Sequence, residues 1–127
     1  MAAVRRFEDL RVWLKARGLA DAIDARCSEP PLSRHFVLAD QMRRAALSVM
    51  SNIAEGFDLG SPRQFRHFLR IAKASAAELR SQLYLCSDRG YLDLALAARL
   101  QEETREIGRM LMALIRHLDR CVADGTG

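Results

Sequence analysis

The sequence has few of the residues that interrupt helices, and this scarcity narrows the fold class. Its 127 residues include only 7 glycines and 3 prolines, which leaves few turns for a many-stranded β-sandwich. Aromatic residues make up 6% of the chain although half of it is apolar, so the apolar half consists mostly of alanine, leucine and isoleucine. Because alanine and leucine favour helix over strand, we expect an all-α protein.

The sequence also lacks the long apolar runs of membrane proteins. Charged residues reach 28%, and no apolar run approaches the ~20 residues that a transmembrane helix needs. The first ten residues carry Arg5, Arg6, Glu8 and Asp9, a charge pattern unlike that of a signal peptide. We therefore expect a cytoplasmic protein with no membrane partner.

Patterns typical of metal, cofactor and catalytic sites are missing too. Cys27, Cys86 and Cys121 are far apart and odd in number, so we expect free thiols rather than a zinc site or a disulfide framework. The sequence contains no Glu-x-x-His pair, no glycine-rich phosphate loop and no nucleophile elbow. We expect no catalytic residues, no metal and no cofactor, and an enzyme is the least favoured class.

Four helical segments follow from the turn and capping residues, at about 7–27, 35–55, 62–89 and 93–123. The pair Pro30–Pro31 ends the first segment, and Gly56 is placed to end the second in the left-handed conformation. Ser61 before Pro62 predicts the start of the third segment, and Asp93 that of the fourth. Similar lengths and short connections predict one antiparallel up-and-down four-helix-bundle domain over residues 1–127.

Apolar residues at helical spacing predict which sides of the two central helices face the core. On the third helix this side comprises Phe65, Phe68, Ala72, Ala76, Leu79, Leu83 and Cys86. On the second helix it comprises Leu38, Met42, Ala45, Ala46, Val49 and Ile53. The second helix is apolar on its opposite side as well, which predicts a subunit interface in a homo-oligomer, formed by Phe36, Leu47, Met50 and Ala54.

A polar stripe accompanies the apolar sides of these two helices. Where the helices face each other, its residues are expected to form a hydrogen-bonded layer that fixes their register rather than performs chemistry. The second helix contributes Gln41, Ser48, Asn52 and Glu55, and the third contributes Ser75, Glu78 and Gln82.

The formal net charge of +4 is concentrated in one segment. Residues 61–90 contain six basic and two acidic side chains, whereas the rest of the chain is nearly balanced. No carboxylate lies between Asp58 and Glu78, and five of the six basic residues of segment 61–90 fall within about 100° of the helical wheel. They are Arg63, Arg66, Arg70, Lys73 and Arg80.

Two functions are compatible with this basic side, beside the ordinary role of a solvated helix face. The first is weak, non-sequence-specific binding of RNA or DNA through backbone phosphates, with Arg43 and Arg44 as further candidate contacts. The alternative is a scaffold that docks an acidic protein partner on the same side and has no nucleic-acid role.

Several segments together resemble a known family. They are Phe-Glu-Asp-Leu-Arg-Val-Trp at 7–13, Gln-x-Arg-Arg-Ala-Ala at 41–46, Asn-Ile-Ala-Glu-Gly at 52–56, Phe-x-x-Phe-Leu at 65–69, Ser-Ala-x-Glu-Leu at 75–79 and Gly-Tyr-Leu at 90–92. Between about residues 7 and 118 the chain is similar to the four-helix-bundle proteins encoded within intervening sequences of bacterial 23S rRNA genes, also called S23 ribosomal proteins.

The resemblance implies an antiparallel four-helix bundle that assembles into a homopentamer. It also implies a likeness in fold to the accessory variability protein of diversity-generating retroelements, a basic pentamer that associates with nucleic acid and reverse transcriptase. The ribosomal name reflects where the genes lie and is weak evidence for ribosome membership.

Overall fold

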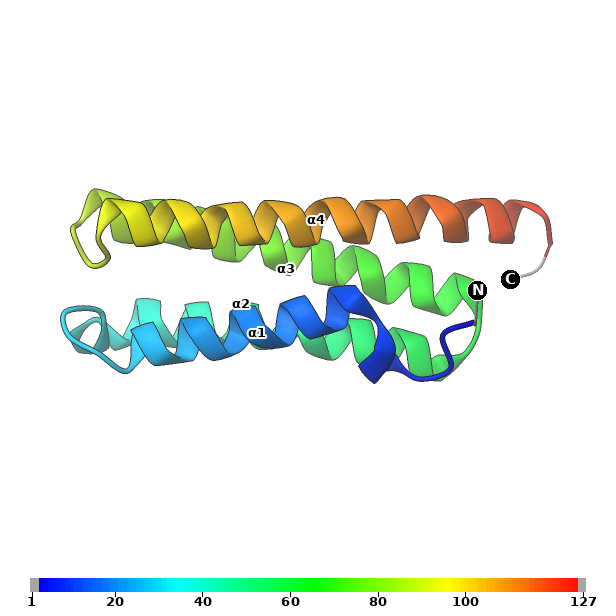
Figure 1. Ribbon diagram of the computed structural model, residues 1–127, viewed down its shortest axis with the longest axis horizontal. Coiled ribbons are helices and arrows are strands. Elements are labelled where there is room, and N and C mark those ends of the chain that lie inside the picture. The colour runs from blue at the N-terminus through cyan, green and yellow to red at the C-terminus, as the bar shows by residue number, and fades with distance from the viewer. Residues whose placement is uncertain (1–2, 126–127) are drawn as a thin grey trace.

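The computed structural model describes residues 3–125, which form four long helices and two short 3-10 turns (Figure 1). The helices are α1 (Arg11–Cys27), α2 (Phe36–Leu59), α3 (Pro62–Asp88) and α4 (Leu94–Ala123). The 3-10 turns, η1 (Phe7–Asp9) and η2 (Leu32–Arg34), precede α1 and α2. The first predicted segment is therefore divided at Leu10, whose extended backbone separates η1 from α1.

The predicted starts of α3 and α4 are confirmed by their capping hydrogen bonds. The backbone N–H of Gln64 donates to Ser61 Oγ at 3.1 Å, and the backbone N–H of Leu96 donates to Asp93 Oδ1 at 2.8 Å. Each bond satisfies an N–H group that has no partner within the helix, which fixes where the helix begins.

The predicted end of the second helix is wrong. Helix α2 continues through Gly56 to Leu59, and Gly60 at φ 87° adopts the left-handed conformation that ends it. Gly56 is buried where α2 meets α3, and a Cβ atom there would lie 2.7 Å from Phe68 Cβ. This glycine therefore allows two helices to approach closely rather than ending one of them.

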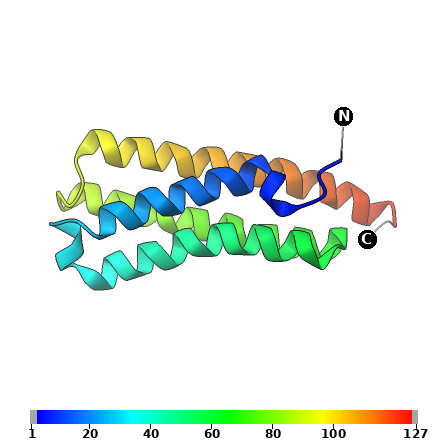
Figure 2. The same ribbon diagram turned by 60° about the horizontal axis from the view of Figure 1, so that its bottom comes forward.

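The fold is an all-α, antiparallel four-helix bundle, as predicted. Each helix packs against its neighbours in sequence, and α4 returns to contact α1. Figures 1 and 2 show the α1–α2 and α3–α4 connections at one end of the bundle and the α2–α3 turn at the other. Consequently α1 lies diagonally across from α3, while α4 lies beside both.

The core is built from aliphatic side chains of all four helices. On α2 and α3, some buried residues are neighbours in sequence of the residues expected in the core. Fully buried residues include Ile23, Val49, Leu79 and Leu111, one from each helix. On α3, Leu69 is buried whereas Phe65 and Phe68 are only half-buried. On α2, Ala39 is buried and Leu38 is half-buried. No helix in the described part of the chain is long and apolar enough to cross a membrane.

Candidate functional site

The basic side of α3 lies next to α4, which alters its charge. Arg66 Nη1 lies 3.1 Å from Asp119 Oδ1, and Arg70 Nη2 lies 3.4 Å from the same oxygen. One α4 carboxylate therefore pairs with two α3 arginines. No carboxylate of α3 itself lies among these basic residues, as the sequence indicates. In the folded protein, however, a carboxylate of α4 lies beside them.

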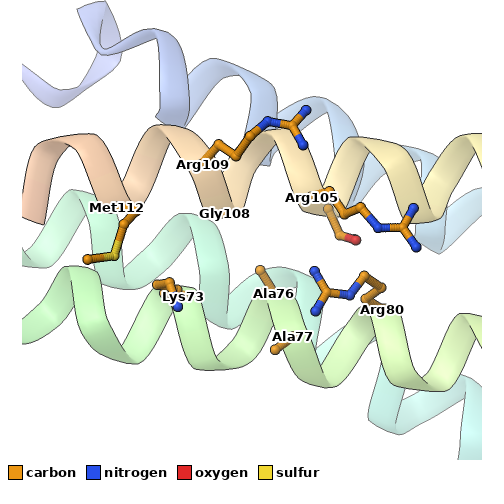
Figure 3. Close-up of a pocket in the computed structure, with 9 residues that line it drawn as sticks. Lys73, Ala76, Ala77, Arg80, Arg105, Gly108, Arg109 and Met112 are labelled. Carbon is orange, nitrogen blue, oxygen red and sulfur yellow. The ribbon is translucent and has the colours of Figure 1, made fainter.

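Two further cations of α3, Lys73 and Arg80, line a groove between α3 and α4, here called the α3/α4 groove (Figure 3). It has a volume of about 350 Å³, and it is lined by Lys73, Ala76, Ala77, Arg80, Thr104, Arg105, Gly108, Arg109 and Met112. Ala76, Ala77 and Gly108 have the smallest side chains of the set, so the space between the helices stays open. Within residues 3–125, Lys73 and Arg80 form no ion pair.

Helix α4 contributes the cations on the other side of the groove. Arg105 Nη1 and Arg109 Nη2 lie 3.5 Å and 2.9 Å from the two carboxylate oxygens of Glu102. The hydrogen bond from Arg109 lowers the pKa of Glu102, so this carboxylate is ionised at neutral pH. Arg105 Nη2 also donates to the hydroxyl of Tyr84 at 2.6 Å. In Figure 3, the Arg80 and Arg105 side chains extend in opposite directions along the groove, and the Arg109 guanidinium lies over the far edge of α4.

The structure does not bring Arg43 and Arg44 to this groove. Arg43 Nε donates to Asp24 Oδ1 of α1 at 2.8 Å, and this bond raises the pKa of Arg43. Arg44 pairs with Asp40 one turn earlier on α2, at 2.9 Å. Since α2 is on the opposite side of α3 from α4, these two arginines are not part of the α3/α4 surface, contrary to their grouping with α3 from sequence. Arg63 is exposed near the start of α3.

Only part of the expected polar layer comes together. The Ser48 and Ser75 hydroxyls lie 2.8 Å apart, and Asn52 Nδ2 donates to the Ser48 carbonyl at 2.8 Å and to its hydroxyl at 3.0 Å. The amide oxygen of Gln82 is buried without a hydrogen-bond partner. The other three expected members lie exposed outside this contact, namely Gln41, Glu55 and Glu78.

The second apolar side of α2 is exposed in part. Phe36 and Leu47 are 74% and 54% exposed. Met50 and Ala54 are half-buried and pack against the core of the same chain. The structure therefore leaves two of the four expected interface residues available for a contact with another molecule.

None of the three cysteines forms a disulfide, and two of them are buried. Burial raises the pKa of Cys86 to about 11 and also raises that of Cys27, so neither is a thiolate at neutral pH. Cys121 is half-buried. No group of three or more His, Cys, Asp or Glu side chains within residues 3–125 is arranged to hold a metal ion.

Sequence reasoning missed the contribution of α4. Arg105 and Arg109 pair with Glu102 of their own helix, and they also line the groove opposite Lys73 and Arg80. The available signal was the pair of small residues Ala76 and Ala77 on α3 together with Gly108 on α4, because small residues leave room between packed helices.

The fold and this surface define a class, a four-helix-bundle protein with a basic groove between its last two helices. A family model described as 23S rRNA-intervening sequence protein matches residues 8–113. The chain therefore belongs to the family of 23S rRNA-intervening sequence proteins. No curated protein sequence matches the chain.

Among solved structures, the chain is similar to a protein from Bacteroides thetaiotaomicron, described as a protein with unknown function from the S23 ribosomal protein family. The two have a TM-score of 0.76 and share 24% sequence identity, and the match covers 82% of this chain and 97% of that one. At this identity the comparison supports the four-helix fold and does not extend to function.

Proposed function

We propose that this chain is a non-enzymatic, cytoplasmic, oligomeric helical-bundle protein that binds the phosphate backbone of RNA or DNA without sequence specificity. The binding surface is the α3/α4 groove together with the basic side of α3 that extends it. The observation that carries the proposal is the position of Lys73 and Arg80, two cations without a carboxylate partner in the described chain, opposite Arg105 across an open groove.

The charge arrangement supports backbone contact rather than base reading. Lys73 and Arg80 are seven residues apart, hence separated by about 10 Å along α3. Side chains with this spacing can contact different phosphates of one strand, and displacing counterions from those phosphates favours binding. The described elements include no recognition helix, zinc finger or other arrangement that reads base edges.

Oligomerisation is the second part of the proposal. The exposed Phe36 and Leu47 on α2 support a contact between copies of the chain, because a second copy packed there would remove these large apolar side chains from water. The family resemblance implies a homopentamer. In a symmetric ring each copy adds one α3/α4 groove, so one long strand can contact several copies and bind more tightly than to a single copy.

The double variant Lys73→Ala/Arg80→Ala tests the binding surface. We expect it to weaken binding of a single-stranded RNA roughly ten- to hundredfold at 50 mM salt, because two phosphate contacts are lost. The slope of log affinity against log salt should fall by about 1.4. Fluorescence anisotropy over a salt series measures both quantities.

The matched control is Arg11→Ala/Arg17→Ala, which removes the same charge from exposed positions of α1, diagonally across the bundle from α3. It should leave the salt slope unchanged. Undetectable binding of wild-type protein to RNA and to duplex DNA at low salt would contradict the proposal. In that case, retention of an acidic protein from nuclease-treated extract, lost in Lys73→Ala/Arg80→Ala, would support the scaffold alternative.

A further inference from the structure

An exposed tyrosine lies beside the α3/α4 groove. Tyr84 is 47% exposed and follows Arg80 by one helical turn on the same side of α3. Its hydroxyl accepts a hydrogen bond from Arg105 Nη2 of α4 at 2.6 Å. This bond ties the phenol to a groove residue, so the ring is held next to the cations rather than free in solvent.

Tyr84 differs from most aromatic residues of the chain. The chain has eight phenylalanine, tyrosine and tryptophan residues, and six of them contact another ring. Within residues 3–125, only Tyr84 and Phe36 make no ring contact, and Phe36 lies on α2, away from the groove. Tyr84 is therefore the exposed ring that accompanies the basic surface.

Lys73, Arg80 and Tyr84 form a line along one side of α3. Their spacing of seven and then four residues keeps them on the same side of the helix, over a length of about 16 Å. Ala76, Ala77 and Gly108 line an open space of about 350 Å³ between the two helices. Cations along a groove with an aromatic ring at its end are the features with which proteins hold unpaired strands.

We propose that the α3/α4 groove binds single-stranded nucleic acid in preference to duplex, with a base stacked on Tyr84; this inference rests on the proposed function. In a duplex the faces of the bases are covered by their neighbours, so a duplex offers only phosphates to this surface. A single strand offers the same phosphates and also exposed base faces, which stack on aromatic side chains with little dependence on sequence.

The test compares Tyr84→Leu and Tyr84→Trp with the wild-type protein, using three probes of equal length: a single-stranded oligouridine, an RNA duplex and an abasic single strand. Tyr84→Leu should weaken oligouridine binding about tenfold, as expected when one base loses its stacking partner. It should leave duplex and abasic-strand binding unchanged. Tyr84→Trp should retain oligouridine affinity, and stacking should quench its added indole fluorescence on titration.

The outcomes separate this inference from the proposed function. Binding of all three probes with no effect of Tyr84→Leu would overturn the stacking role and leave the phosphate-binding function intact. Equal or tighter binding of the duplex by wild-type protein would overturn the preference for single strands. Failure of the wild-type protein to bind any probe at low salt would overturn both proposals.

Discussion

At the scale of single residues, Asp119 controls how much of the basic surface is available. It is ion-paired with both Arg66 and Arg70, and the Arg66 side chain is only 20% exposed. A phosphate that approaches these arginines must compete with a carboxylate already in place. The two arginines therefore contribute less to anion binding than their charges suggest.

The variant Asp119→Asn should strengthen nucleic-acid binding. Removing the negative charge frees Arg66 and Arg70 for phosphates, and the gain should be about two- to fivefold in affinity, the size of an exposed ion pair. Anisotropy titration at 50 mM salt measures it. Asp124→Asn, which makes the same charge change beyond the end of α4, is the control. An unchanged affinity in Asp119→Asn would show that these arginines do not contact the nucleic acid.

The sequence could predict the positions of the α3 cations but not the role of Asp119. Helical periodicity is local, so the side of α3 that carries Arg63, Arg66 and Arg70 follows from their spacing alone. Asp119 lies 53 residues beyond Arg66, and their contact depends on the packing of α3 against α4. The groove lined by Lys73 and Arg105 depends on the same packing and was therefore not predicted.

At the scale of the elements, Gly56 determines how closely α2 approaches α3. A glycine inside a helix ordinarily costs about 0.5–1 kcal/mol relative to alanine, so a buried one needs a compensating contact. Here the compensation is the close approach of Phe68, whose Cβ lies 2.7 Å from where an alanine Cβ would be. Local sequence rules read this glycine as a helix end because they contain no information about the neighbouring helix.

Gly56→Ala and Gly18→Ala should therefore have opposite effects on stability. Gly56→Ala forces α2 and α3 apart and should lower the free energy of unfolding by about 1–3 kcal/mol. Gly18 lies exposed inside α1 with no atom within 4 Å of an added Cβ, so Gly18→Ala should raise it by about 0.5–1 kcal/mol. Urea denaturation followed by circular dichroism measures both, and destabilisation of equal size in both variants would contradict this account.

At the scale of the whole molecule, the proposed oligomer depends on the exposed apolar residues of α2. Light scattering coupled to size exclusion should give a mass that is a multiple of the 14.3 kDa chain. Phe36→Ser/Leu47→Ser should shift the population towards the single chain without unfolding it, because both side chains are largely exposed. The control Leu94→Ser changes an equally exposed residue of α4 and should retain the assembly. A wild-type mass of 14.3 kDa at micromolar concentration would contradict the prediction.

The order of the helices around the bundle has a consequence for folding. Because each helix packs against the next one in the chain, most contacts join segments that are close in sequence, and the contact between α1 and α4 is the main exception. Chains with such low contact order fold in about microseconds to milliseconds. The three consecutive helix pairs are hairpins with short loops, and the contact between α1 and α4 joins the two ends of the chain. The basic groove lies within the third of these hairpins, between two consecutive helices, so its two walls are joined by a short loop and do not depend on the contact between α1 and α4.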